Sequence, residues 1–195
     1  MRKIISLILL GIFVFINSFY AEEWHVKKSD SNLVKFTSTT PVLDFDGTTS
    51  KIDGYIYWKG KEFFSEGNEI YFEVDLNSVE TGIGKRDTDM REDVLETDQW
   101  AKTWYRGTIV SVEKSKDENT HNLKSNGIMF IHGLEKEIEV NAKAIVENNK
   151  MQIISDFSVF LNDYKIEAPS LLAFIKVAEE IKLHLDFQLE KASEK

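Results

Sequence analysis

The sequence contains no cysteine and only two prolines among its 195 residues. Without cysteine the protein has neither disulfide bonds nor a cysteine-ligated zinc ion to hold it together, so its stability must come from a buried apolar core. The chain is long enough to build such a core. Because low-complexity tracts and internal repeats are also absent, we predict a single folded domain.

The patterns that bind metal ions are missing. None of the four histidines lies four residues from another, and no His-Glu-x-x-His motif is present. The acidic stretch that starts at Asp87 has Glu92 where a calcium loop of the EF-hand type needs glycine, and Asp98 where it needs glutamate. We therefore expect no metal site.

The patterns of phosphate binding and nucleophilic catalysis are missing as well. The turn Gly82-x-Gly84-Lys85 lacks the spacing of a phosphate loop, and no Gly-x-Ser-x-Gly elbow occurs. No two carboxylates can be singled out as an acid and base pair without geometry. The sequence therefore gives no positive case for an enzyme, and we predict no catalytic residue and no cofactor.

Basic residues are in deficit. The chain has 24 Lys and Arg against 33 Asp and Glu, which gives a formal net charge of −9 at pH 7. Loss of Arg2 and Lys3 with an N-terminal signal would make the balance more negative still. This acidity argues against a nucleic-acid partner and against docking on anionic lipid headgroups.

One long apolar run is present, at the N-terminus. Arg2 and Lys3 precede the apolar residues 4–16, and the small residue Ala21 follows. A basic start, an apolar stretch and a small residue are the layout of a secretory signal. The run is short of the ~20 apolar residues of a membrane span. An uncleaved N-terminal anchor is the alternative.

These observations divide the chain into three parts. We expect residues 1–21 to be a signal peptide that directs a bacterial protein to the periplasm or out of the cell. Residues 22–190 form the folded domain, and residues 191–195 form a polar tail. No integral membrane span is expected once the signal is removed.

The dominant pattern in the domain is alternation with a period of two. In the last segment, apolar residues from Ile181 to Leu189 alternate with polar residues from Lys182 to Glu190. Such alternation is typical of antiparallel strands with one covered face and one wet face. It predicts strands near 33–40, 50–60, 69–77, 104–114, 123–132, 135–147, 150–161 and 179–190, with a short opening strand at 24–26.

The predicted strands are long, and this suggests how they assemble. Several have about nine to eleven residues, or roughly 30–35 Å at ~3.3 Å per residue, whereas typical strands are shorter. Eight such strands predict an all-β fold, an extended antiparallel barrel that closes on itself and leaves no exposed edges. A barrel of this size is either filled by its own side chains or holds one small ligand, and alternation does not separate these cases.

Two stretches break the alternation. Residues 87–97 place Met90 and Val94 at helical spacing among charged residues. Pro169 and Ser170 open a second, apolar stretch, and proline is favoured at the start of a helix. We predict a short helix in both connections, with Phe174 on the apolar face of the second.

Separated motifs along the chain resemble the YceI-like family of periplasmic lipid-binding proteins. One is the strand and turn that reads V-D-x-x-S-V-x-T-G, and another is the later G-x-M-x-I-H-G. Their order and spacing cover residues 24–190. The matching segments are Trp24, 34–38, Gly54, 74–82, 86–91, 95–98, 127–133, 164–170 and 177–183.

The sequence departs from the family pattern at two positions. Asp89 stands where the family usually has histidine, which replaces a titratable donor with an acceptor. Any role of that histidine is therefore not carried over. Ala101 stands where proline is usual, which removes a stiff residue at the start of a strand, although Trp100 keeps the aromatic ring before it.

The resemblance implies a lipocalin-like barrel whose interior holds a long apolar or amphiphilic molecule, such as a polyisoprenoid, an isoprenoid quinone or a fatty-acid derivative. The protein would then be a non-catalytic carrier in the periplasm or outside the cell, with that ligand as its partner. The more apolar face of each strand would line the cavity, and a residue of the second helix would close one end. The expected lining residues are Ile56, Trp58, Phe72, Val74, Leu76, Phe157, Val159, Phe174, Leu185 and Phe187.

Two other interpretations stay open at this point. In the first, the protein is an enzyme that acts on an isoprenoid or stress-related metabolite through Arg86, Asp87 and Arg91, although these residues also suit the anchoring of a strand-to-helix turn. In the second, it is an outer-membrane barrel with outward apolar faces, against which the charges spread through the strands argue. The sequence leaves open the identity of the ligand, the formation of a homodimer, and whether the ligand is stored, transported or sequestered.

Overall fold

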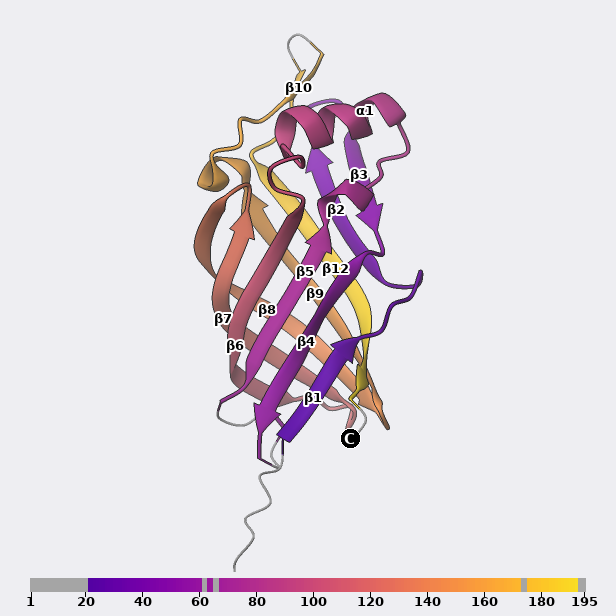
Figure 1. The fold of residues 1–195 in the computed structure, drawn as a ribbon, viewed down its shortest axis with the longest axis vertical. Helices are drawn as coiled ribbons and strands as arrows, with labels where there is room; N and C mark the ends of the chain where they lie inside the picture. Colours follow the sequence, from indigo (N-terminus) through magenta and orange to yellow (C-terminus); the bar gives the residue numbers. More distant parts are fainter. Residues whose placement is uncertain (1–20, 61–62, 65–66, 173–174, 193–195) are drawn as a thin grey trace, which may run out of the picture.

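The computed structural model describes residues 21–60, 63–64, 67–172 and 175–192. In these ranges, ten strands form one antiparallel sheet that is rolled into a long barrel, and a separate two-stranded hairpin lies at one end (Figure 1). The predicted signal peptide lies outside the described residues except for Ala21, and so do residues 193–195 of the predicted tail.

The strands follow one another with helical turns in two connections. They are β1 (Ala21–Val26), β2 (Leu33–Thr39), β3 (Asp44–Thr49), β4 (Ile52–Lys59), β5 (Glu69–Asp75), η1 (Leu76–Ser78), α1 (Gly84–Asp89), η2 (Met90–Val94), β6 (Lys102–Lys114), β7 (Thr120–Ile131), β8 (Leu134–Glu147), β9 (Lys150–Phe160), η3 (Leu161–Tyr164), β10 (Ser170–Leu172), β11 (Ile175–Lys176) and β12 (Glu180–Lys191). The helical turns lie between β5 and β6 and between β9 and β10.

The ten strands occupy eight positions around the barrel. β1 and β2 pair with successive parts of β12, residues 24–26 with 189–191 and residues 33–38 with 181–186. In the next position, β3 is bonded to β2 and β4 is bonded to β1. The sheet continues through β5 to β9 and returns to β12, so it closes as an eight-stranded antiparallel barrel. The predicted fold class is confirmed.

One strand of the barrel was not expected from the alternation. β3 has the sequence Asp-Phe-Asp-Gly-Thr-Thr, in which Phe45 is the only large apolar side chain. It forms because its backbone bonds to β2 on one side. On the other side, Thr48 and Glu80 exchange backbone hydrogen bonds of 2.9 and 3.0 Å.

The predicted helix after Pro169 is wrong. Its residues form the antiparallel strands β10 and β11 instead. A stretch this short is marginal as an isolated helix, and its backbone donors find other partners. The Val177 N–H donates to the Pro169 carbonyl (3.0 Å), and the Ala178 N–H donates to the Thr39 carbonyl at the end of β2 (2.8 Å). Phe174 lies outside the described residues.

The first predicted helix is confirmed. α1 is followed by a single π-helical turn, η2, in which the Leu95 N–H donates to the Met90 carbonyl over 2.9 Å. Figure 1 shows this helical segment across the end of the barrel where β2 ends and β3 begins. It forms a lid on that end, which we call the α1 end.

Hydrogen bonds to the preceding loop anchor α1. The Asp87 carboxylate accepts from the Thr81 N–H (2.8 Å) and from the Thr81 hydroxyl. Arg86 donates to the Thr81 hydroxyl (2.8 Å) and carbonyl (2.9 Å), and Arg91 donates to the Val79 carbonyl (2.8 Å). The three polar groups of the enzyme interpretation are thus used to hold the helix in place.

The opposite end of the barrel is filled by its own side chains. Trp24, Trp58, Phe64, Met151 and Leu189 are all buried there. The rings of Trp58 and Phe64 meet edge to face with their centroids 4.8 Å apart, an arrangement that aromatic pairs favour. This packing closes the barrel at the end far from α1.

Gly54 allows a close approach of β4 and β5. Its φ is +141°, and a Cβ there would lie 2.1 Å from the Tyr71 carbonyl oxygen. We expect Gly54→Ala to lower the free energy of unfolding by about 3 kcal/mol, because overpacking costs ~1–3 kcal/mol and backbone strain adds to it. Gly84→Ala is the control, since a Cβ there meets nothing within 4 Å, and it should change this free energy by less than about 1 kcal/mol. Urea denaturation measures both, and equal losses would contradict the clash.

The anchor of α1 makes stability depend on pH. The hydrogen bond from the Thr81 hydroxyl holds the pKa of Asp87 below its usual value of 3.8. A lowered folded-state pKa adds stability above the unfolded value, and this stability is lost as the pH falls through the folded value. Asp87→Asn keeps an acceptor oxygen but removes the charge. We expect it to lower the free energy of unfolding at neutral pH by about 1.5–3 kcal/mol.

The same variant should lose less further stability than the wild type when the pH falls from about 5 to about 2, because it has no carboxylate left to protonate. Urea denaturation at several pH values measures this difference. Parallel stability curves for the two proteins would show that Asp87 contributes nothing to acid unfolding.

Candidate ligand cavity

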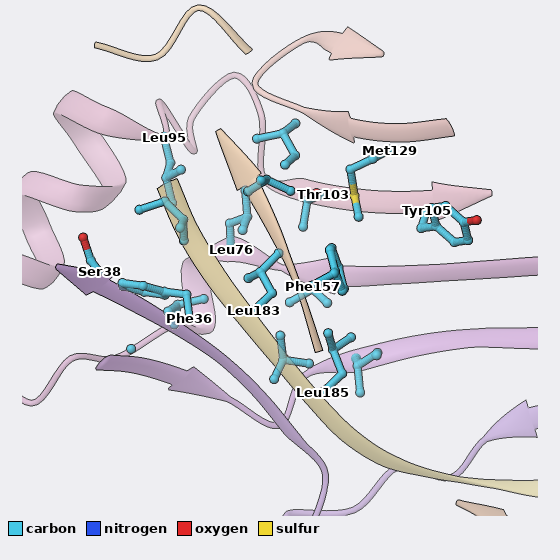
Figure 2. A pocket seen from close by; sticks show the side chains of 18 of the residues that line it. Phe36, Ser38, Leu76, Leu95, Thr103, Tyr105, Met129, Phe157, Leu183 and Leu185 are labelled. Carbon is cyan, nitrogen blue, oxygen red and sulfur yellow. Dashed lines mark hydrogen bonds between the residues drawn. The ribbon is translucent and has the colours of Figure 1, made fainter. Parts of the chain in front are cut away.

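A cavity of about 560 Å³ lies inside the barrel at the α1 end. Figure 2 shows that side chains from several strands, among them Phe36, Phe157, Leu183 and Leu185, point into it together with Leu95 from the lid. The volume falls within the range of roughly 300–1,000 Å³ that is usual for small-molecule sites. The barrel is therefore only partly filled by its own side chains.

The structure brings most of the predicted lining residues together. Trp58 is buried but lies below the cavity, where it packs on Phe63 and Phe64 with ring centroids 5.4 and 4.8 Å away. Phe174 is not among the described residues. Contact of these residues with a ligand stays a prediction. The eight that form part of the wall are Ile56, Phe72, Val74, Leu76, Phe157, Val159, Leu185 and Phe187.

The wall also contains residues that the sequence-based list missed. Phe36 and Leu123 lie on β2 and β7 with the same inward parity as the predicted residues, so the rule of alternation would have found them if it had been applied to every strand. Met90 and Leu95 reach the cavity from the helical lid. Their contribution depends on how the lid folds over the barrel, which alternation does not predict.

Three hydroxyl groups of the cavity wall are bonded to the protein, whereas the buried hydroxyl of Ser38, at the end of β2, has no hydrogen-bond partner among the described residues. Tyr105 donates to the Ser125 hydroxyl (3.0 Å), which donates to the Val140 carbonyl (3.1 Å), and Ser155 donates to the Asn141 carbonyl (2.7 Å). Burial raises the pKa of Tyr105, so its phenol stays neutral. With these donors occupied, the deep part of the cavity presents a largely apolar surface.

Charged side chains line the cavity at one end only. They are Lys85, Arg86 and Asp89, all on α1. The Lys85 ammonium donates to both oxygens of Asp89 at 2.9 Å, and this contact raises the pKa of Lys85. The Arg86 guanidinium lies 4.4 Å from the centre of the Phe45 ring. The cavity is thus apolar in depth, and its charged lining residues lie at the α1 end.

A histidine ties the lid to the barrel. The His132 Nε2 lies 3.0 Å from Glu96, which follows η2, and its Nδ1 lies 3.4 Å from the Tyr164 carbonyl. Neither His132 nor Glu96 lines the cavity.

Among the residues that the structure describes, no cluster of three or more potential ligands could hold a metal ion. In the same residues, no helix is long and apolar enough to span a membrane.

Solved structures share this fold. BcnA from Burkholderia cenocepacia superimposes with a TM-score of 0.65 at 12% identity, over 84% of this chain and 98% of that one. A polyisoprenoid binding domain from Saccharophagus degradans, implicated in plant cell wall breakdown, gives 0.70 at 16% identity, over 87% and 98%. The Campylobacter jejuni YceI protein gives 0.53 at 17% identity, over 76% and 84%. At these identities the likeness establishes the fold alone.

Comparison of the sequence, rather than of the fold, identifies the family of the chain. No curated protein matches it. The YceI-like domain, however, matches residues 24–189, which include the whole barrel except the ends of β1 and β12. The chain therefore belongs to the YceI-like domain family.

Proposed function

We propose that the protein is a carrier that binds a long-chain apolar or amphiphilic molecule inside the barrel, such as a polyisoprenoid, an isoprenoid quinone or a fatty-acid derivative. The cavity carries this proposal, because it is apolar in depth and charged at the α1 end only. Membership of the YceI-like family and the polyisoprenoid binding named for the Saccharophagus degradans domain support it.

The energetics favour a long ligand. Burial of one methylene contributes about 0.8 kcal/mol, so about sixteen methylenes contribute roughly 13 kcal/mol. Association costs roughly 4–15 kcal/mol in lost freedom of motion. A short chain would therefore hardly bind, whereas a long one retains about 9 kcal/mol at the low end of this cost, which corresponds to micromolar affinity or better.

Carriage fits the site better than catalysis does. The polar groups named for an enzyme, Arg86, Asp87 and Arg91, form hydrogen bonds to the loop before α1. The hydroxyls Tyr105, Ser125 and Ser155 are likewise bonded to the protein. These named groups are thus occupied by structural hydrogen bonds rather than free to act as a nucleophile or base.

The proposed location is the periplasm or the cell exterior. It rests on the N-terminal segment, in which two basic residues, an apolar run and a small residue follow one another as in a secretory signal. A carrier in that compartment would move or hold its ligand in the aqueous space next to a membrane.

Direct analysis of the purified protein tests the proposal. Extraction with organic solvent followed by mass spectrometry should release a long-chain lipid that co-purifies with the protein. Binding of fluorescent fatty-acyl and isoprenoid probes should be saturable with one site per chain. The proposal fails if no lipid is released and no probe binds.

Filling the cavity should weaken binding. Ala142 lies on β8 and lines the cavity, so Ala142→Phe should displace at least two methylenes of the ligand. At about 0.8 kcal/mol each, we expect at least a roughly tenfold loss of affinity for a sixteen-carbon fatty-acyl probe. Titration of the probe by fluorescence measures the loss.

Ala101→Phe is the matched control, because Ala101 is exposed and lies outside the cavity wall. It should leave the affinity unchanged, and circular dichroism should show that both variants fold. The same affinity for Ala142→Phe as for the wild type would place the ligand elsewhere.

A further inference from the structure

Exposed apolar side chains gather beside the cavity at the α1 end. Val42 and Leu43, in the turn between β2 and β3, are 66% and 50% exposed, and Ile83, which precedes α1, is 53% exposed. Phe45, two residues after Leu43, contacts Arg86, three residues after Ile83. The turn and the start of α1 therefore lie side by side, as Figure 1 shows for β3 and α1. We call Val42, Leu43 and Ile83 the apolar lip.

The lip is continuous with the interior of the barrel. Ile83 lines the cavity although more than half of its surface is exposed, and Phe45 lines it beside the turn. Through Ile83 and Phe45 the exposed lip thus adjoins the apolar cavity wall. Exposed apolar patches of this kind mark sites of interaction with other molecules or membranes.

We propose that the apolar lip docks on the surface of a lipid bilayer with zwitterionic headgroups, so that the ligand passes between membrane and cavity without crossing water. This inference rests on the proposed carrier function. It names the partner from which the ligand is loaded or to which it is delivered, and the continuity of the lip with the cavity is the observation that carries it.

The charges around the lip select the kind of membrane. Lys85 is exposed and paired with Asp89, so this pair adds no net charge. Asp44 and Glu80 are exposed close to the lip in sequence, and the whole chain has a net charge of −9. An anionic surface would therefore repel the protein. On a zwitterionic surface the apolar side chains can enter the interface while the charged groups stay at the level of the headgroups.

The turn can be altered without harm to the fold or the cavity. The Leu43 carbonyl accepts from the Thr40 N–H (3.0 Å) and hydroxyl (2.7 Å), so the backbone holds the turn. Neither Val42 nor Leu43 lines the cavity. The double variant Val42→Asp, Leu43→Asp therefore changes the lip and leaves the binding residues in place.

Two measurements test the proposal. The first is co-sedimentation of the purified protein with phosphatidylcholine vesicles that contain no ligand. The second is the rate at which a fluorescent fatty-acyl probe passes from such vesicles to the protein. We expect the double variant to lose vesicle binding and to slow the transfer at least fivefold, while its equilibrium affinity for the probe in solution stays unchanged. Addition of phosphatidylglycerol to the vesicles should weaken the binding of the wild type.

Val110→Asp is the matched control, because Val110 is as exposed as Ile83 (53%) but lies on β6, outside the lip. It should bind vesicles like the wild type.

The docking proposal is overturned if the wild type does not sediment with vesicles, or if the double variant and Val110→Asp behave alike. It is also overturned if the double variant only converts a dimer to a monomer in ultracentrifugation, since the lip would then contact a second copy. If the wild type does not bind the fatty-acyl probe in solution at all, the proposed carrier function is overturned instead.

Discussion

The pairing of β12 with strands on both of its sides is the interaction on which the rest of the structure depends. It bonds to β9 along eleven residue pairs on one side and to β2 and β1 on the other, and so joins the two ends of the sheet. Because successive side chains point to opposite faces, a slip of one residue would turn every apolar side chain of β12 outward. The register that places Phe187 opposite Ile153 therefore also decides that the barrel has an apolar interior.

Closure alone would give a filled barrel, and the sizes of the inward side chains decide where space remains. At the closed end, Trp24 and Trp58 occupy the interior. Farther toward α1, Gly107 and Gly127 face each other across β6 and β7. A Cβ at either glycine would lie 2.7 Å from an atom of the Tyr105 phenol, so the ring rests against the wall where the glycines leave room. Large residues thus seal one end, while a phenol laid flat keeps the other end open.

This division explains what the sequence could and could not reveal. Alternation predicted the barrel and the inward direction of Phe72 and Leu185, because period two is a local property of a strand. It could not tell that Trp58, which has the same parity as Ile56, lies beneath the cavity, since depth depends on the register of all the strands together. The conformation of the segment after Pro169 was misjudged because its two short strands pair with each other. The segment is also held by a hydrogen bond from the Ala178 N–H to Thr39, which is far away in the sequence.

The helix α1 contains both contacts that hold it in place and contacts that can be broken easily. Asp87 and Arg86 bond to the loop before the helix from partly buried positions, where each lost partner costs about 1–3 kcal/mol. The Lys85–Asp89 pair on the same helix is exposed, and solvent-exposed ion pairs contribute little to stability. A polar group at the mouth can therefore separate Lys85 from Asp89 at little cost without moving the helix. Asp89 thus neutralises the charge of Lys85, while Arg86 leaves this end of the cavity wall with one net positive charge.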